Sequence, residues 1–114
     1  MAEESKLENT VKNYARESGV LTYKFVSPAH RGVPDRLFVF PGGFVLFIEF
    51  KAKGKVPTPL QARYLKLLRE QGALVAWIDS LQAGLDIIDG LLEKTSGRSV
   101  VKELANADVE ARRQ

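Results

Sequence analysis

The sequence predicts an α/β fold in which a central mixed sheet is flanked by helices, with the element order α-β-β-β-α-β. Segments 37–40 and 44–50 are apolar on both faces and are joined by a Pro-Gly-Gly turn at 41–43. This pattern is typical of a hairpin in a sheet that is covered on each side. Another apolar segment, 73–78, follows a predicted helix. That order indicates a crossover connection, which adds a strand to the same sheet.

The first half of the chain supplies one helix and one more strand. Residues 3–18 carry apolar side chains at helical spacing, and Gly19 ends the helix. Residues 20–26 are rich in β-branched and aromatic types, which predicts a strand. Pro28 and Gly32 interrupt regular structure in the loop that follows.

The second half of the chain supplies two further helices. Thr58 caps a helix over 58–71, with Gly72 just past its end. Its buried face is predicted to consist of Leu60, Tyr64, Leu67 and Leu68. Asp79 or Ser80 then caps a third helix, whose predicted buried residues are Leu81, Leu85, Ile88 and Leu92. We expect one domain over residues 1–94 and a polar C-terminal tail over 95–114 with a weak helical stripe.

Composition limits the kinds of site that the chain can build. The 114 residues include no cysteine and a single histidine, His30, which excludes disulfides, thiolate sites and multi-histidine zinc sites. Any metal would be held by carboxylate and carbonyl oxygens, which favours Mg²⁺ or Mn²⁺, and no small-molecule cofactor is expected. No apolar run approaches the ~20 residues needed to cross a bilayer, and the N-terminus is acidic rather than signal-like. We therefore expect a cytoplasmic protein without membrane contact.

The charge distribution suggests an anionic partner. The formal net charge is +3, and the stretch from Lys51 to Arg69 contains no acid. Such a run is either a solvated face or a surface that tracks nucleic-acid phosphates. Its candidate DNA-binding residues are Lys53, Lys55, Arg63 and Lys66, and the loop residues His30 and Arg31 could also reach a phosphate.

Three charged residues lie at the ends of the apolar hairpin strands, where an unpaired charge is unfavourable. If Phe40 lies opposite Phe44 across the turn, the same register places Asp35 opposite Glu49. Their Cβ atoms would then be about 4.5–5.5 Å apart. Lys51 lies two residues beyond Glu49 and would project from the same face, whereas a one-residue slip would separate the two acids.

Two facing carboxylates repel unless one is protonated or a cation lies between them. A divalent ion held by Asp35, Glu49 and a backbone carbonyl such as that of Phe50 would remove the conflict. Lys51 would then face the ion's water or a phosphate oxygen. This arrangement suits metal-assisted phosphodiester hydrolysis. The alternative is that Asp35 merely begins a strand and that Glu49 and Lys51 are a frayed strand end.

At these residues the chain resembles the PD-(D/E)XK nuclease superfamily, with its restriction-endonuclease-like fold, and more narrowly a stand-alone VRR-NUC domain. The resemblance spans residues 3–92 and is carried by three motifs: Gly32-Val33-Pro34-Asp35, Ile48-Glu49-Phe50-Lys51 and Thr58-Pro59-Leu60-Gln61. It implies that Asp35 and Glu49 are metal ligands and that Lys51 is the catalytic lysine. It also implies a site role for Gln61, which could instead serve a capping box with Thr58, and for an acid on the first helix.

For that helix acid we choose Glu8, with Glu4 one turn earlier as the alternative; both could also be ordinary solvated residues at a helix start. The resemblance further implies a DNA endonuclease of bacterial or viral origin, acting in a bacterial cytoplasm or a virus-infected cell. It implies selectivity for branched DNA such as Holliday junctions, most simply achieved by a homodimer with two active sites. The competing hypotheses are a non-catalytic nucleic-acid-binding module that uses the basic run 51–69, and a structural or assembly protein of the same fold.

Overall fold

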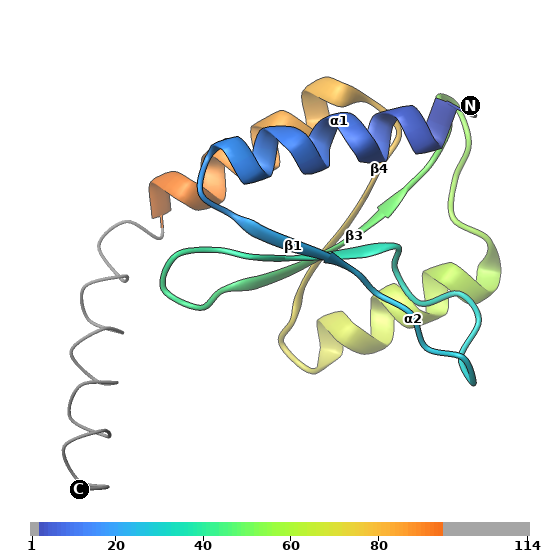
Figure 1. Cartoon of the computed structure of the whole chain (residues 1–114). Helices are drawn as coiled ribbons and strands as arrows, with labels where there is room; N and C mark the ends of the chain where they lie inside the picture. Colours follow the sequence, from blue (N-terminus) through green and yellow to red (C-terminus); the bar gives the residue numbers. More distant parts are fainter. Residues whose placement is uncertain (1–2, 95–114) are drawn as a thin grey trace, which may run out of the picture.

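The computed structural model of the chain describes residues 3–94 (Figure 1). Its elements are α1 (Glu3–Glu17), β1 (Leu21–Lys24), β2 (Arg36–Val39), β3 (Val45–Phe50), α2 (Pro59–Glu70) and β4 (Leu74–Ile78), followed by a helix over 81–94. The predicted α/β class and element order are confirmed. The predicted tail at 95–114 lies outside the described residues. None of the described helices has the length and apolar character that crossing a membrane requires.

The four strands form one mixed sheet in the order β1-β2-β3-β4. The β1–β2 and β2–β3 pairs are antiparallel, whereas β3 and β4 are parallel. Parallel neighbours require a crossover between them, and α2 supplies it, as the sequence predicted. β1 is shorter than the predicted strand because it pairs only with the four residues of β2.

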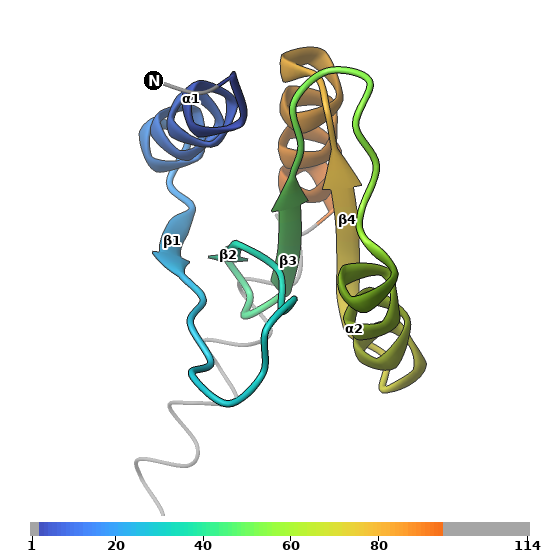
Figure 2. The same cartoon turned by 90° about the vertical axis from the view of Figure 1, so that its right-hand side faces the viewer.

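Helices cover both faces of the sheet (Figure 2). α1 and helix 81–94 lie side by side on one face, and α2 lies on the other face beside β4. The two helices on the shared face run in the same direction, since Val11 lies beside Gly84 and Tyr14 donates a hydrogen bond to Asp89. The core between these two helices and the sheet consists of buried apolar residues from both helices and from the sheet: Val11, Ala15, Val20, Phe38, Phe40, Leu46, Ile48, Phe50, Ile78 and Ile88.

The predicted buried face of α2 was partly wrong. Leu60 and Leu67 are 44% and 43% exposed, and the buried residue of the helix is Leu65. The helix contacts the sheet mainly along β4, and its first turn lies against the loop at Gly32, where an added Cβ would be 2.9 Å from the Leu60 side chain. The contact stripe is therefore rotated by about one residue from the one that periodicity alone selects.

The third helix begins as predicted but buries a different first residue. The Ser80 hydroxyl accepts a hydrogen bond from the Ala83 amide at 3.3 Å, so Ser80 is the cap. Asp79 instead accepts from the Gly54 amide at 3.1 Å and holds the loop after β3. Leu81 is 42% exposed, which contradicts its predicted burial, whereas Ile88 is fully buried. The Leu81 side chain instead lines an open cavity together with Leu7 of α1.

Candidate active site

The β2–β3 hairpin has the register that the sequence predicted. Arg36 pairs with Ile48, so the next pair along the ladder is Asp35 with Glu49. The turn sets this register: Phe40 and Phe44 are bonded across it, and Gly43 has a φ of 90°, which favours glycine. The Oδ2 atom of Asp35 accepts a hydrogen bond of 2.8 Å from the Phe50 amide. The carboxylate of Asp35 therefore lies directly against the end of β3.

Glu49 is a buried carboxyl group with an incomplete set of partners. Its Oε2 atom lies 3.2 Å from the Lys51 ammonium. Its Oε1 atom is the only buried side-chain polar atom in residues 3–94 without a hydrogen-bond partner. Such an orphan is unfavourable by about 1–3 kcal/mol. Burial, followed by the nearby charge of Asp35, raises the pKa of Glu49 from 4.5 to about 7, although Lys51 opposes the rise.

The same physics acts on Asp35. Burial raises the pKa of its carboxyl group, and the hydrogen bond from the Phe50 amide opposes the rise. The two neighbouring acids therefore both favour a proton or a cation. Strongly perturbed carboxyl groups of this kind cluster at functional sites. In the part of the chain that the structure describes, Asp35, Glu49 and Lys51 meet at one place, as predicted.

Glu4 and Glu8, the two candidate acids of α1, differ in their surroundings near the Asp35–Glu49–Lys51 site. The Oε2 atom of Glu8 is held by the Lys24 ammonium at 2.6 Å and by the Arg36 guanidinium at 3.0 Å. Glu4 is exposed, and its charge contributes to raising the pKa of both Asp35 and Glu49. The choice of Glu8 as the helix acid of the site stays a prediction, with its carboxylate already engaged by two cations.

Gln61 forms the capping box that was its alternative explanation. Its Oε1 atom accepts from the Thr58 amide at 2.9 Å, and its own amide donates to the Thr58 hydroxyl at 3.2 Å. Both bonds satisfy backbone groups at the start of α2. The structure thus gives Gln61 a structural function, and its role at the active site stays a prediction.

Known proteins are similar to this chain in sequence and in fold. No family model matches the chain. A protein named "Putative nuclease p44", from Acyrthosiphon pisum secondary endosymbiont phage 1, is 44% identical over 77 residues, which cover 68% of this chain and 83% of that protein. A solved structure named "VRR_NUC domain" superimposes with a TM-score of 0.73 at 27% identity, covering 78% of this chain and 97% of that one. The chain belongs to the VRR-NUC family.

A second solved structure, named "VRR_NUC domain protein", agrees in fold. It has a TM-score of 0.65 and covers 82% of this chain and 90% of its own, at 16% identity. The restriction-endonuclease-like architecture predicted from the three motifs is therefore confirmed. The roles of individual residues in this VRR-NUC domain rest on the geometry described above.

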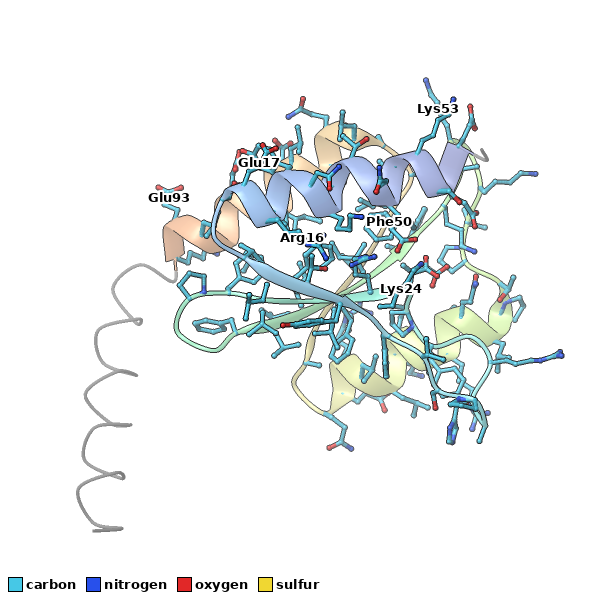
Figure 3. All side chains as sticks on the ribbon, viewed as in Figure 1. Arg16, Glu17, Lys24, Phe50, Lys53 and Glu93 are labelled. Carbon is cyan, nitrogen blue, oxygen red and sulfur yellow. The ribbon has the colours of Figure 1, made fainter. Side chains whose placement is uncertain are left out.

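The residues predicted to contact DNA are all exposed in this VRR-NUC domain: His30, Arg31, Lys53, Lys55, Arg63 and Lys66. His30 is held by the Ser27 hydroxyl at 2.9 Å and lies edge-on to the ring of Tyr64 on α2. Lys53 lies at the N-terminal end of α1 (Figure 3) and lines a cavity with Lys51. Lys66 lies 3.9 Å from Glu70. DNA contact by these side chains stays a prediction.

The oxygen atoms at the site fit a hard divalent cation. Glu49, which carries the buried orphan oxygen, lies close enough to Asp35 to feel its charge, and the backbone carbonyl of Phe50 belongs to the same strand end. Oxygen donors of this type suit Mg²⁺ or Mn²⁺. No group of three or more acidic or histidine side chains gathers within residues 3–94, so the VRR-NUC site offers a pair of carboxylates.

Sequence reasoning missed two cations next to this pair. Arg36 is 7% exposed although it is charged, and Lys24 lies directly across from it on β1. The sequence does contain a signal for Arg36. This residue immediately follows Asp35 at the start of an apolar strand, where a buried charge needs a partner.

Proposed function

We propose that this VRR-NUC domain is a divalent-metal-dependent DNA endonuclease that prefers branched DNA such as Holliday junctions. The observation that carries the proposal is the meeting of Asp35, Glu49 and Lys51 at the end of β3, with one buried carboxylate oxygen left without a partner. Because the chain belongs to a family of nucleases, phosphodiester hydrolysis is the chemistry that we assign to this arrangement. The name of the phage relative agrees with it.

Each residue has a distinct part in the proposed reaction. Asp35, Glu49 and the Phe50 carbonyl would hold Mg²⁺ or Mn²⁺, which supplies an acidified water and neutralises phosphate charge when bound. The Phe50 amide fixes one oxygen of Asp35 and so orients the other. Lys51 is 12% exposed in its side chain, and its ammonium donates to the phosphate oxygen on which negative charge develops, or orients the attacking water.

The proposed preference for branched DNA is tied to a homodimer. A four-way junction must be cut in two strands, and two copies related by a twofold axis present two sites of opposite direction. This selectivity, together with action in a bacterial or virus-infected cytoplasm, forms the finer part of the proposal. The phage origin of the 44% identical relative supports the proposed place of action and does not bear on the preferred DNA structure.

The decisive experiment is a cleavage panel of linear duplex, flap and four-way-junction DNA with Mg²⁺, with Mn²⁺ and with a chelator. Wild-type protein should cut the junction fastest and only with a metal. Asp35→Asn should lower cleavage by at least ~10²-fold, because the variant loses a charged ligand. Glu17→Gln, an exposed change at the C-terminal end of α1, serves as the control and should cut normally.

Metal-dependent cleavage that persists in Asp35→Asn would contradict the site. Salt-sensitive DNA binding without turnover in any divalent metal would instead favour the binding module that uses residues 51–69.

A further inference from the structure

A second cleft lies along the flank of α1 that faces β1 and β2. Its volume is about 290 Å³, and it is lined by Ser5, Glu8, Asn9, Lys12, Lys24 and Arg36. Three of these side chains are cations and one is a carboxylate. Concave surfaces of one predominant sign concentrate the field and attract ions of opposite sign. This cleft, which we call the α1 flank cleft, therefore favours an anion.

Glu8 brings the cations of the cleft together. One carboxylate oxygen contacts both Lys24 and Arg36, which come from neighbouring strands and would otherwise repel each other. Lys12 follows Glu8 by four residues, the spacing at which the two types pair on a helix. Within the described residues, however, Lys12 forms no ion pair, because the carboxylate of Glu8 is turned to the strands. The cleft thus retains a cation with no partner in its wall.

Arg36 also keeps donors for a ligand. Its Nε atom donates to Glu8 at 3.0 Å and its Nη1 atom to the Thr22 hydroxyl at 3.3 Å. The Nη2 atom has no bond within residues 3–94, yet it is not among the buried atoms without a partner. It must therefore be open to solvent, although the residue as a whole is 7% exposed. A guanidinium held on two sides with a free edge is pre-organised for a phosphate oxygen.

The α1 flank cleft adjoins the candidate active site. Arg36 follows Asp35 in the chain, and the charges of Glu8 and Lys24 both reach the Asp35 carboxyl group. In Figure 3, Lys24 and Phe50 lie beneath α1, away from the end of the molecule that carries Glu17 and Glu93. The active site itself has two carboxyl groups and one ammonium, and the ammonium is already paired with Glu49, so without a metal the site offers a phosphate no unpaired cation. Any attraction for the DNA strand that does not depend on a metal must come from neighbouring cations.

We propose that the α1 flank cleft binds one backbone phosphate of the DNA strand that is cut, beside the scissile phosphate. Lys12, Lys24 and the free edge of Arg36 contact its oxygens, while Asn9 and Ser5 line the rim. Glu8 acts as a positioning residue for the two strand cations. This inference rests on the proposed nuclease function, but it concerns binding and is tested without cleavage.

The test measures binding of a labelled duplex DNA to the full chain in chelator, over a series of salt concentrations. The double variant Lys12→Gln/Lys24→Gln should bind roughly tenfold more weakly than wild type. Because two of the three cations that contact this one phosphate are removed, the slope of log K against log[salt] should fall in magnitude by at most about 0.9 and not by twice that amount. Lys94→Gln, which removes one exposed cation at the far end of helix 81–94, should change neither quantity. Thermal melting of each variant checks that the fold is kept.

Three results would overturn the inference: equal affinity of wild type and double variant, the same loss in Lys94→Gln, or a slope change of about 1.8. The last would mean two separate phosphates. Failure of the nuclease proposal gives a different result. In that case wild-type protein does not cut in Mg²⁺ or Mn²⁺, while the double variant still shows the binding defect in chelator.

Discussion

Raising the pH should destabilise the metal-free protein through Glu49. The side chain of Glu49 is 3% exposed, and one of its oxygens has no partner. Burial raises the pKa of the folded carboxyl group from 4.5 to about 7, with a further contribution from Asp35 and an opposing one from Lys51. Proton binding at this group is therefore tighter in the folded than in the unfolded chain.

The difference in proton binding at Glu49 determines how the free energy of unfolding changes with pH. Between pH 4.5 and about 7, the folded chain binds more protons at Glu49 than the unfolded chain does, so the free energy of unfolding falls as the pH rises. The contribution is fully present below the unfolded pKa and is lost as the pH passes the folded pKa. At about 1.4 kcal/mol for each tenfold change in proton affinity, the loss amounts to about 3 kcal/mol. The raised pKa of Asp35 acts in the same direction.

Urea denaturation in chelator from about pH 5 to about pH 8 measures this loss. Glu49→Gln should flatten most of the pH dependence and be more stable than wild type near pH 8, since a neutral amide avoids the burial of charge. Glu17→Gln, an exposed acid at the end of α1, is the matched control and should keep the wild-type dependence. Stability that does not change over this range in wild type, or an unchanged slope in Glu49→Gln, would refute the reasoning.

Two further predictions concern helix packing and capping. Gly84→Ala should lower the free energy of unfolding by about 1–2 kcal/mol, although alanine has the better helix propensity, because the new Cβ would lie 2.8 Å from a methyl group of the buried Val11. Gly90→Ala should raise the free energy of unfolding by up to about 1 kcal/mol, because its new Cβ would have nothing within 4 Å. Urea titrations of the pair test this, and equal effects would contradict it. Thr58→Ala should lower the free energy of unfolding by about 1 kcal/mol, because it removes the N-cap of α2, and should leave cleavage intact. Gln61→Ala should lower both stability and cleavage if Gln61 acts at the active site. Equal cleavage in both variants would restrict Gln61 to the cap.

Much of the fold could be predicted because its signals are local. Caps and stops mark the helices, as at Thr58 and Ser80. The hairpin register depends on a turn of defined length, so the pairing of Arg36 with Ile48 is implied once the turn is assigned. The buried face of α2 could not be predicted in this way. Its orientation depends on the contact of its first turn with the loop around Gly32, which is distant in sequence, and on the way the helix packs against β4.

The candidate site also has a part that local sequence predicts and a part that depends on how the elements pack. Because the hairpin alone sets Asp35 opposite Glu49 and puts Lys51 on the same face, the chemistry of the site could be predicted from one continuous stretch. The surroundings of α1 could not, because its rotation against the sheet decides which of its side chains reach β1 and β2.

By itself, the sequence determined the α/β class, the register of the hairpin and the three charged groups at its end, because turn length and strand alternation act over neighbouring residues. Only the tertiary structure decided that Glu8 is held by Lys24 and Arg36, that α2 buries Leu65 and leaves Leu60 and Leu67 exposed, and that a cationic cleft adjoins the acids. The reason is physical: each of these contacts joins side chains whose approach depends on how whole elements pack, and packing is settled by the core that they share.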